Sequence, residues 1–276
     1  MAHALVSKGC RIMLFDLWGR GYTDSPLGVK HNPALYAKQI DYAVKSSQLE
    51  WSDGFSLIGF SLGGGIAMHY AATHPELLDS VVLLGPAGIV RRLPAGYMKW
   101  VFKFPVLDGT AYVRRAVAQC VGATTPLAEG SEVTESEGEG HTVERQKPDM
   151  AAIVQWQWNS HEGFLHSFVD TLRHGPVMHQ HEDWRAVCRI LKMEKAPAYL
   201  TGGNNGLYGS KLLIIFGDDD TVVLKSEVVP DMEEMLGKGA EDHLVVRDVP
   251  GGHGFPSTEG SKVVEHIAEF WRLPSG

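Results

Sequence analysis

The sequence has little cysteine and no long apolar run. Its three cysteines, Cys10, Cys120 and Cys188, are odd in number and lie far apart. Such a set favours neither a disulfide framework nor a zinc cluster and is typical of a reducing compartment, so we expect a cytoplasmic protein. The apolar stretches at 81–84 and 212–216 are far shorter than the roughly 18 residues that a membrane-spanning helix needs, so no membrane span is expected.

Basic residues are also scarce. The 25 lysines and arginines are outnumbered by 33 aspartates and glutamates, which gives a formal charge of −8. Because nucleic acid is bound through clustered positive charge, this balance argues against a nucleic-acid partner. A chain of 276 residues with 44% hydrophobic residues is long enough to bury a sizeable core, either as one domain or as a core with an inserted subdomain.

Short apolar segments alternate with helical patterns along most of the chain. This alternation is typical of an α/β fold with a mostly parallel sheet flanked by helices. The predicted strands are 11–16, 55–58, 80–84, 211–216 and 243–248, and the predicted helices are 32–49, 63–73 and 259–271.

The pattern changes between residues 91 and 194, which contain helical segments and no strand-like runs. We expect this region to form a helical cap inserted into an α/β core made of residues 1–90 and 195–276. Within the cap, 129–144 is acidic and contains glycine, and it is predicted to be an exposed loop.

The segment 59–63 reads Gly-Phe-Ser-Leu-Gly and matches the pattern G-x-S-x-G. It directly follows an apolar strand and precedes a helix of small residues, which favours a nucleophilic Ser61 on a sharp turn over an incidental serine in a glycine-rich turn. Glycines at 59, 63, 64 and 65 are expected to let the helix approach the strand. The backbone N–H of Leu62, at the helix N-terminus, is the expected oxyanion donor.

A serine hydroxyl needs a base, and the base needs an orienting carboxylate. In this type of site the chain order is serine, acid, histidine. His253 lies in a glycine-rich loop after the last predicted strand, where an imidazole can reach back to Ser61. Asp220 is the preferred acid over Asp219 and Asp218, since the apolar residues that follow it can bury its loop.

Four segments resemble the α/β-hydrolase superfamily, in particular its capped branch of esterases, lactonases and C–C bond hydrolases. Residues 16–26 are similar to the family's D-x-x-G-x-G-x-S-D-x-P segment and 59–65 to its nucleophile elbow, and 217–220 and 252–253 resemble the loops of the acid and the histidine. The resemblance implies the fold and the Ser61–His253–Asp220 triad, with no cofactor or metal. A serine at the elbow argues against haloalkane dehalogenases and epoxide hydrolases, which share this scaffold.

The N-terminus departs from the family pattern. The family has three strands before the segment at 11–16, and the third ends in a His-Gly loop that supplies a second oxyanion N–H. Residues 1–9 instead resemble the end of the helix that follows that loop. In this fold the missing strand lies between 11–16 and 55–58, so these two either pair directly or leave an open edge.

Losing one oxyanion donor costs about 100- to 1,000-fold in rate, so activity is expected to be reduced. Three explanations compete for the missing strand. The chain is a truncated gene model or a fragment, which we favour, or a rearranged sheet compensates, or a second subunit of a homodimer covers the edge.

The predicted cap would roof Ser61 and define the substrate pocket. Its aromatic residues favour a small or medium hydrophobic ester or lactone, cleaved through an acyl-enzyme. The candidate pocket residues are Phe60, Trp18, Trp156, Trp158 and Phe164. Two other readings stay open: a C–C bond hydrolase with the same triad, and a non-catalytic hydrolase-like protein that binds a ligand.

Overall fold

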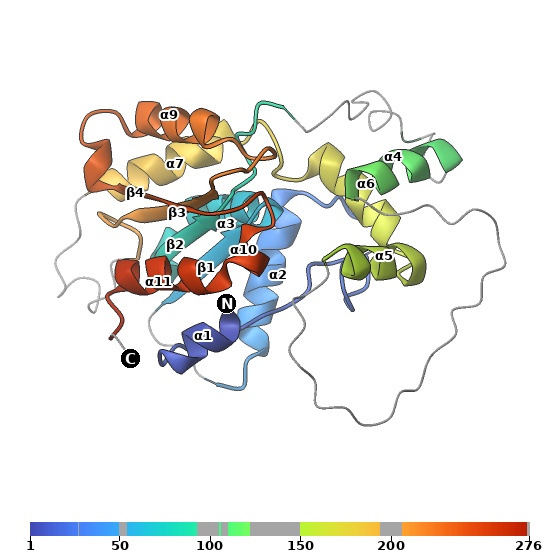
Figure 1. Cartoon of the computed structure of the whole chain (residues 1–276), viewed down its shortest axis with the longest axis horizontal. Helices are drawn as coiled ribbons and strands as arrows, with labels where there is room; N and C mark the ends of the chain where they lie inside the picture. The colour runs from blue at the N-terminus through green and yellow to red at the C-terminus, as the bar shows by residue number, and fades with distance from the viewer. Residues whose placement is uncertain are drawn as a thin grey trace.

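A four-stranded parallel sheet forms the centre of the molecule (Figure 1). The computed structural model describes residues 1–26, 28–49, 54–92, 105, 110–121, 150–193 and 206–274, so the predicted loop at 129–144 lies outside them. The strands follow one another in space in the order of the sequence, and each neighbouring pair is parallel. They are β1 (Phe55–Phe60), β2 (Leu78–Leu84), β3 (Leu212–Gly217) and β4 (Leu244–Val249). The α/β class is confirmed.

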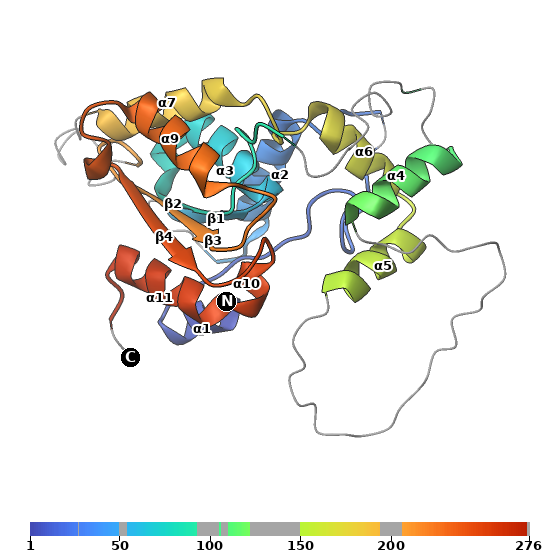
Figure 2. The ribbon, with the colours of Figure 1, turned by 45° about the horizontal axis from the view of Figure 1, so that its top comes forward.

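Helices cover both faces of the sheet (Figure 2). On one face lie α2 (Pro33–Ser46), α3 (Leu62–Thr73), α7 (His181–Lys192) and α9 (Lys225–Leu236). On the other lie α1 (Ala2–Ser7) and α11 (Gly260–Trp271), which contact each other. The remaining short elements are α10 (Phe255–Thr258) and the 3-10 helices η1 (Pro75–Leu77) and η4 (Ala240–Asp242).

The central strands are apolar along most of their length, from Val81 to Leu84 in β2 and throughout β3, because both of their faces are covered. Successive side chains of a strand point to opposite faces. In β3, Ile214 and Phe216 therefore join the core under α3 and α9, while Leu213 and Ile215 join the core under α11. Every residue of β3 is buried.

The boundaries of α2 follow from its sequence. The Asn32 side chain accepts a hydrogen bond from the Leu35 N–H at 2.9 Å and caps the helix, and Pro33 occupies the first turn, where no amide hydrogen is needed. At the other end of the chain, α11 buries a stripe that includes Val263, Val264 and Ile267. Both helices confirm the sequence prediction.

Three helices of the predicted cap lie together beside the sheet, at the right of Figure 1. They are α4 (Ala111–Val121), α5 (Met150–Ser160) and α6 (Phe164–His174). Val113 and Val117 of α4 share a small apolar cluster with Val169 of α6. The next helix, α7, packs on α3 and α9 instead. The cap at 91–194 stays a prediction, and this packing favours counting α7 with the core.

The predicted strand at 11–16 is wrong. These residues form no strand, and Leu14 and Phe15 are 77% and 41% exposed. A strand forms only when a neighbouring strand takes its backbone hydrogen bonds, and β1 pairs with β2 alone among the described residues. Of the two outcomes expected for the gap, the described sheet has the open edge.

The two edges of the described sheet differ in charge. β1 contains no charged residue, whereas β4 carries Arg247 and Asp248. Arg247 pairs with Glu269 of α11 at 3.6 Å, and Asp248 pairs with Lys225 of α9. Among the described helices, none has the length and apolar character needed to cross a membrane.

Candidate active site

Ser61 occupies the sharp turn between β1 and α3. Its backbone has φ 50° and ψ −117°, a conformation that non-glycine residues rarely adopt. Three backbone hydrogen bonds hold the turn: the Ser61 N–H donates to the Leu84 carbonyl at 3.0 Å, and the N–H groups of Gly64 and Ala87 donate to the Ser61 carbonyl at 2.8 and 2.9 Å. A strained serine fixed at a helix N-terminus is the geometry expected of a nucleophile elbow.

The glycines around Ser61 differ in the neighbouring atoms that a Cβ would meet. A Cβ on Gly59 would overlap the carbonyl of Gly63, so this glycine does let the strand approach the helix. Cβ atoms on Gly64 and Gly65 would instead overlap Pro86 and Pro176, which lie in other loops, and a Cβ on Gly63 would meet no atom within 4 Å. The prediction that all four glycines serve strand–helix packing therefore holds for Gly59 and is wrong for the others.

His253 lies in the loop between β4 and α10. Its Nε2 is 2.9 Å from Ser61 Oγ, and its Nδ1 is 2.8 Å from Asp220 Oδ2. The histidine side chain is 22% exposed, whereas that of Asp220 is 1% exposed. The imidazole therefore bridges the serine and a buried carboxylate, with its own edge open to solvent.

Asp220 follows β3 and is held by its own loop. Its Oδ1 accepts hydrogen bonds from the N–H groups of Val222 and Val223 at 2.8 and 2.9 Å. Burial opposes ionisation of this carboxyl, but the bonds from His253, Val223 and Val222 outweigh burial and hold its pKa below the usual value. Asp218 and Asp219 are exposed, so it is Asp220 that the structure brings to the histidine.

The three side chains can move a proton. A carboxylate that accepts from Nδ1 leaves the Nε2 lone pair free to take the serine proton. Leu62 is the first residue of α3, where an N–H has no acceptor within the helix, and the helix dipole adds partial positive charge there.

Of the predicted pocket residues, Phe60 is brought to this site. It is 37% exposed, and its ring lies 5.1 Å from that of His253 and 6.3 Å from that of Phe255. Trp18 lies against α2 instead. Its backbone N–H donates to the Gln39 side-chain oxygen, and its ring lies 6.2 Å from that of Tyr42.

The other pocket candidates contact the predicted cap and the loop before α2. Trp156 is 39% exposed and lies 5.0 Å from the ring of Tyr22. Trp158 packs on the cluster shared by α4 and α6. Phe164 is buried, and its ring lies 5.1 Å from the Arg20 guanidinium. None of these contacts involves Ser61, and a pocket role for the three residues stays a prediction.

Sequence reasoning missed a second polar cluster that joins the loop at 19–31 to α6. It contains His31 and Asp170, which are 139 residues apart in the chain. The local sequence around either residue shows no motif, so only the tertiary fold could reveal the pairing.

The comparisons with known proteins agree with this geometry. A family model described as the alpha/beta hydrolase fold matches residues 1–259. A 2-hydroxymuconate semialdehyde hydrolase from Pseudomonas sp. (strain CF600) is 32% identical over 84 residues, which cover 30% of this chain and 29% of that protein. The matched stretch thus spans less than a third of that relative.

Solved structures give the same fold. A carboxylesterase of Nitrososphaera gargenis superposes with a TM-score of 0.59 at 14% identity, covering 98% of this chain and 83% of that one. A meta-cleavage product hydrolase from Pseudomonas fluorescens IP01 superposes with a TM-score of 0.53 at 16% identity, covering 93% and 78%.

A parallel sheet with a strained serine between a strand and a helix is the arrangement of the α/β-hydrolase fold. The chain belongs to the alpha/beta hydrolase fold family. The proteins similar to it carry the names of a carboxylesterase, a meta-cleavage product hydrolase and a 2-hydroxymuconate semialdehyde hydrolase.

Proposed function

We propose that the protein is a serine hydrolase that cleaves a small or medium hydrophobic carboxylic ester or lactone. One observation carries this proposal: Ser61, His253 and Asp220 form a continuous chain of hydrogen bonds at 2.9 and 2.8 Å. Family membership supports a hydrolase, and the exposed Phe60 ring beside His253 supports an apolar substrate.

The proposed reaction is acyl transfer in two halves. Nε2 of His253 takes the Ser61 proton while Oγ bonds to the carbonyl carbon of the substrate. The resulting oxyanion accepts a hydrogen bond from the Leu62 N–H. The C–O bond to the leaving group breaks, and the imidazolium returns its proton to the departing alkoxide. A water deprotonated by His253 then attacks the acyl carbon. The bond between that carbon and Ser61 Oγ breaks, Oγ takes the proton from the imidazolium, and the acid is released. Asp220 stabilises the imidazolium during both halves.

A fluorophosphonate probe tests the nucleophile directly. We expect covalent labelling of Ser61, read by peptide mass spectrometry, and turnover of short p-nitrophenyl esters. Ser61→Ala and His253→Ala should abolish labelling of that peptide. A folded sample that takes up no probe and turns over no ester would instead support the non-catalytic, ligand-binding alternative.

Hydrolysis of a C–C bond is the second candidate. It is favoured by the similarity to a 2-hydroxymuconate semialdehyde hydrolase and by the meta-cleavage product hydrolase among the structural neighbours. A panel that contains esters, lactones and activated diketones separates the two. A kcat/KM higher for the diketone than for every ester would replace the first proposal with the second.

A further inference from the structure

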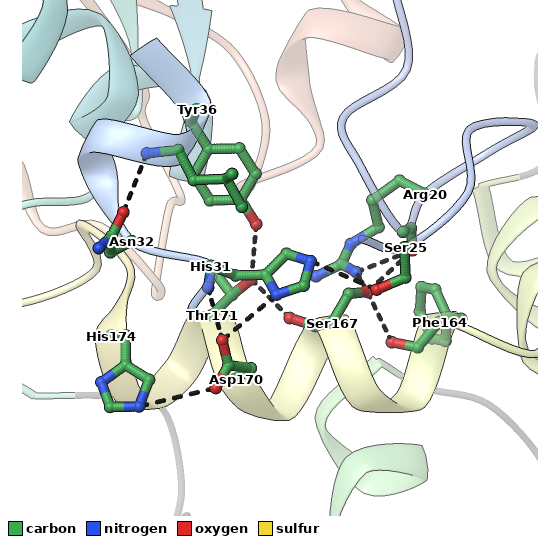
Figure 3. A network of polar contacts seen from close by, with 12 residues as sticks. Arg20, Ser25, His31, Asn32, Tyr36, Phe164, Ser167, Asp170, Thr171 and His174 are labelled. Atoms are coloured by element: carbon green, nitrogen blue, oxygen red, sulfur yellow. Dashed lines mark hydrogen bonds and ion pairs between the residues drawn. The ribbon is translucent and has the colours of Figure 1, made fainter. Parts of the chain in front are cut away.

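A second set of aspartate, histidine and serine lies away from Ser61, between the loop at 19–31 and α6 (Figure 3). His31 stands at its centre. The Asp170 carboxylate oxygen Oδ2 is 2.5 Å from the backbone N of His31 and 3.2 Å from its Nδ1. On the other side of the ring, Nε2 is 3.4 Å from Ser25 Oγ.

Two more polar contacts tie α6 to the same region. Arg20 donates to Ser167 Oγ, and that hydroxyl donates to the Gly19 carbonyl at 2.9 Å. Tyr36 of α2 shares a hydrogen bond of 2.7 Å with Thr171. Together with the contact of His31, these hydrogen bonds join Ser167, Asp170 and Thr171 of α6 to α2 and to the loop before it.

The centre of the cluster is closed to solvent, while Ser25 and Asp170 are partly exposed. The side chain of His31 is 0% exposed, and Tyr36, Ser167 and Thr171 are buried. A buried polar group that loses its partner costs more than an exposed one, so each contact holds α6 in a single position. The closed position of His31, together with its longer distances, argues against a nucleophilic role for Ser25.

Burial favours a neutral His31, and the hydrogen bonds determine which ring nitrogen carries its proton. A carboxylate next to Nδ1 holds a proton there, which leaves Nε2 as an acceptor for the Ser25 hydroxyl. Burial lowers the pKa of His31, the hydrogen bond and charge of Asp170 raise it, and the charges of Arg20 and His166 lower it, with a net lowering.

The charged and titratable groups around His31 come from every element packed on it. Asp170 and His166 belong to α6, Arg20 belongs to the loop, and Tyr36 belongs to α2. Burial lowers the pKa of Arg20 to about 10, which leaves this residue charged at neutral pH. Burial also raises the pKa of Tyr36, which keeps that residue neutral. Acid would therefore place a second cation beside Arg20.

The end of α6 leads to the elbow. The loop at 175–180 follows it, and Gln180 donates to the Gly65 carbonyl of α3 at 2.7 Å. The Gly88 N–H donates to the Val177 carbonyl at 3.0 Å, and the Gln180 N–H donates to the Gly88 carbonyl at 2.9 Å. Ala87, next to Gly88, donates to the Ser61 carbonyl. The position of α6 is thus linked to the turn that holds Ser61.

We propose that neutral His31 is a positioning residue, which holds α6 and its following loop for substrate binding and releases them when it is protonated. This inference rests on the proposed esterase activity. Because the folded pKa lies below the ordinary 6.5, the stabilising effect of neutral His31 is complete above about pH 6.5. It is lost as pH falls below that value toward the folded pKa.

The test compares KM and kcat for a p-nitrophenyl ester between pH 8 and about pH 5. His31→Asn keeps an N–H donor for Asp170 and does not titrate. In acid, KM of the unmodified protein should increase by a factor that is about fivefold larger than the factor for His31→Asn. A difference of this size is typical of coupling between sites. The change of kcat with pH should be the same for both. His3→Asn, exposed on α1, is the matched control and should follow the unmodified protein.

Ser25→Ala guards against a His31 variant that does not fold. Without the hydroxyl that donates to Nε2, the neutral ring is less favoured, so the rise of KM should move toward neutral pH. Superimposable KM profiles for the unmodified protein and either folded variant would overturn the inference. That result is distinct from failure of the proposed function, which shows as no Ser61 labelling at any pH.

Discussion

Asp220, His253 and Ser61 meet at one place in the molecule, and Asp170, His31 and Ser25 meet at another. The first set has distances of 2.8 and 2.9 Å and a histidine that is 22% exposed. The second has distances of 3.2 and 3.4 Å and a histidine with no exposure. The two sets share their residue types and differ in access, in hydrogen-bond length and in the backbone of the serine.

The serine backbone is the sharpest difference. Ser61 has φ 50° and directly precedes the first residue of α3, whereas Ser25 lies in a loop outside any helix or strand. A helix N-terminus supplies the N–H group and partial charge that an oxyanion needs. Three residue types that can form a proton relay would therefore make a reaction site only where a substrate can enter and the developing charge is stabilised.

The largest expected effect separates the two serines. Ser61→Ala should lower kcat for a p-nitrophenyl ester by about 10⁶-fold, because it removes the nucleophile of a group that acts as a unit. Ser25→Ala should retain kcat at pH 8. The comparison breaks if Ser25→Ala alone abolishes probe labelling.

The two aspartates should differ next. Asp220→Asn should lower kcat by about 10⁴-fold with KM little changed, since the amide favours the wrong histidine tautomer. Asp170→Asn should act on KM and on the thermal midpoint and leave most of kcat. Steady-state kinetics and a thermal melt of both variants check this, and equal losses of kcat would contradict it.

The strained turn offers a smaller, structural contrast. In Gly59→Ala the new methyl group would overlap the Gly63 carbonyl, so we expect a loss of about 1–3 kcal/mol in the free energy of unfolding together with lower activity. Gly63→Ala meets no atom within 4 Å and serves as the matched control. Urea denaturation measures both, and equal stability of the two variants would contradict the packing argument.

The smallest expected effect concerns Tyr36, whose ring lies 6.1 Å from that of His31 in the second set. Tyr36→Phe removes the hydrogen bond to Thr171, at a cost of about 1 kcal/mol, while kcat at pH 8 is unchanged. Tyr42→Phe, at an exposed position of the same helix, should cost less. A loss of kcat in Tyr36→Phe without loss of stability would instead give the region around His31 a direct part in the reaction.

The sequence predicted the first set and missed the second for a physical reason. Ser61, Asp220 and His253 each lie at the end of a strand, next to glycines that mark a turn. The carboxyl ends of neighbouring parallel strands meet at one edge, so local signals were enough. His31 meets Asp170 through the packing of α6 on a loop, and no local pattern encodes that contact.

The fold was predictable wherever an element carries its own pattern. β2 contains the apolar run Val81–Leu84, β3 is apolar throughout, and α2 has a cap and a proline at its start. Residues 11–16 have a strand-like sequence as well, yet strand formation also requires a neighbour, which the sequence of the segment does not supply. Apolar pattern predicts what a segment prefers, and pairing decides what it forms.

The uncharged edge of β1 has a consequence for how the protein behaves in bulk. Within the described part of the chain no strand pairs with the outer side of β1, and β1 has no lysine, glutamate or proline to repel an incoming strand, whereas β4 has two ion pairs. Net repulsion from the charge of −8 acts over about a Debye length and fades in salt. Self-association through this edge should therefore grow with both protein concentration and ionic strength, and a single lysine at Ser56 should suppress it.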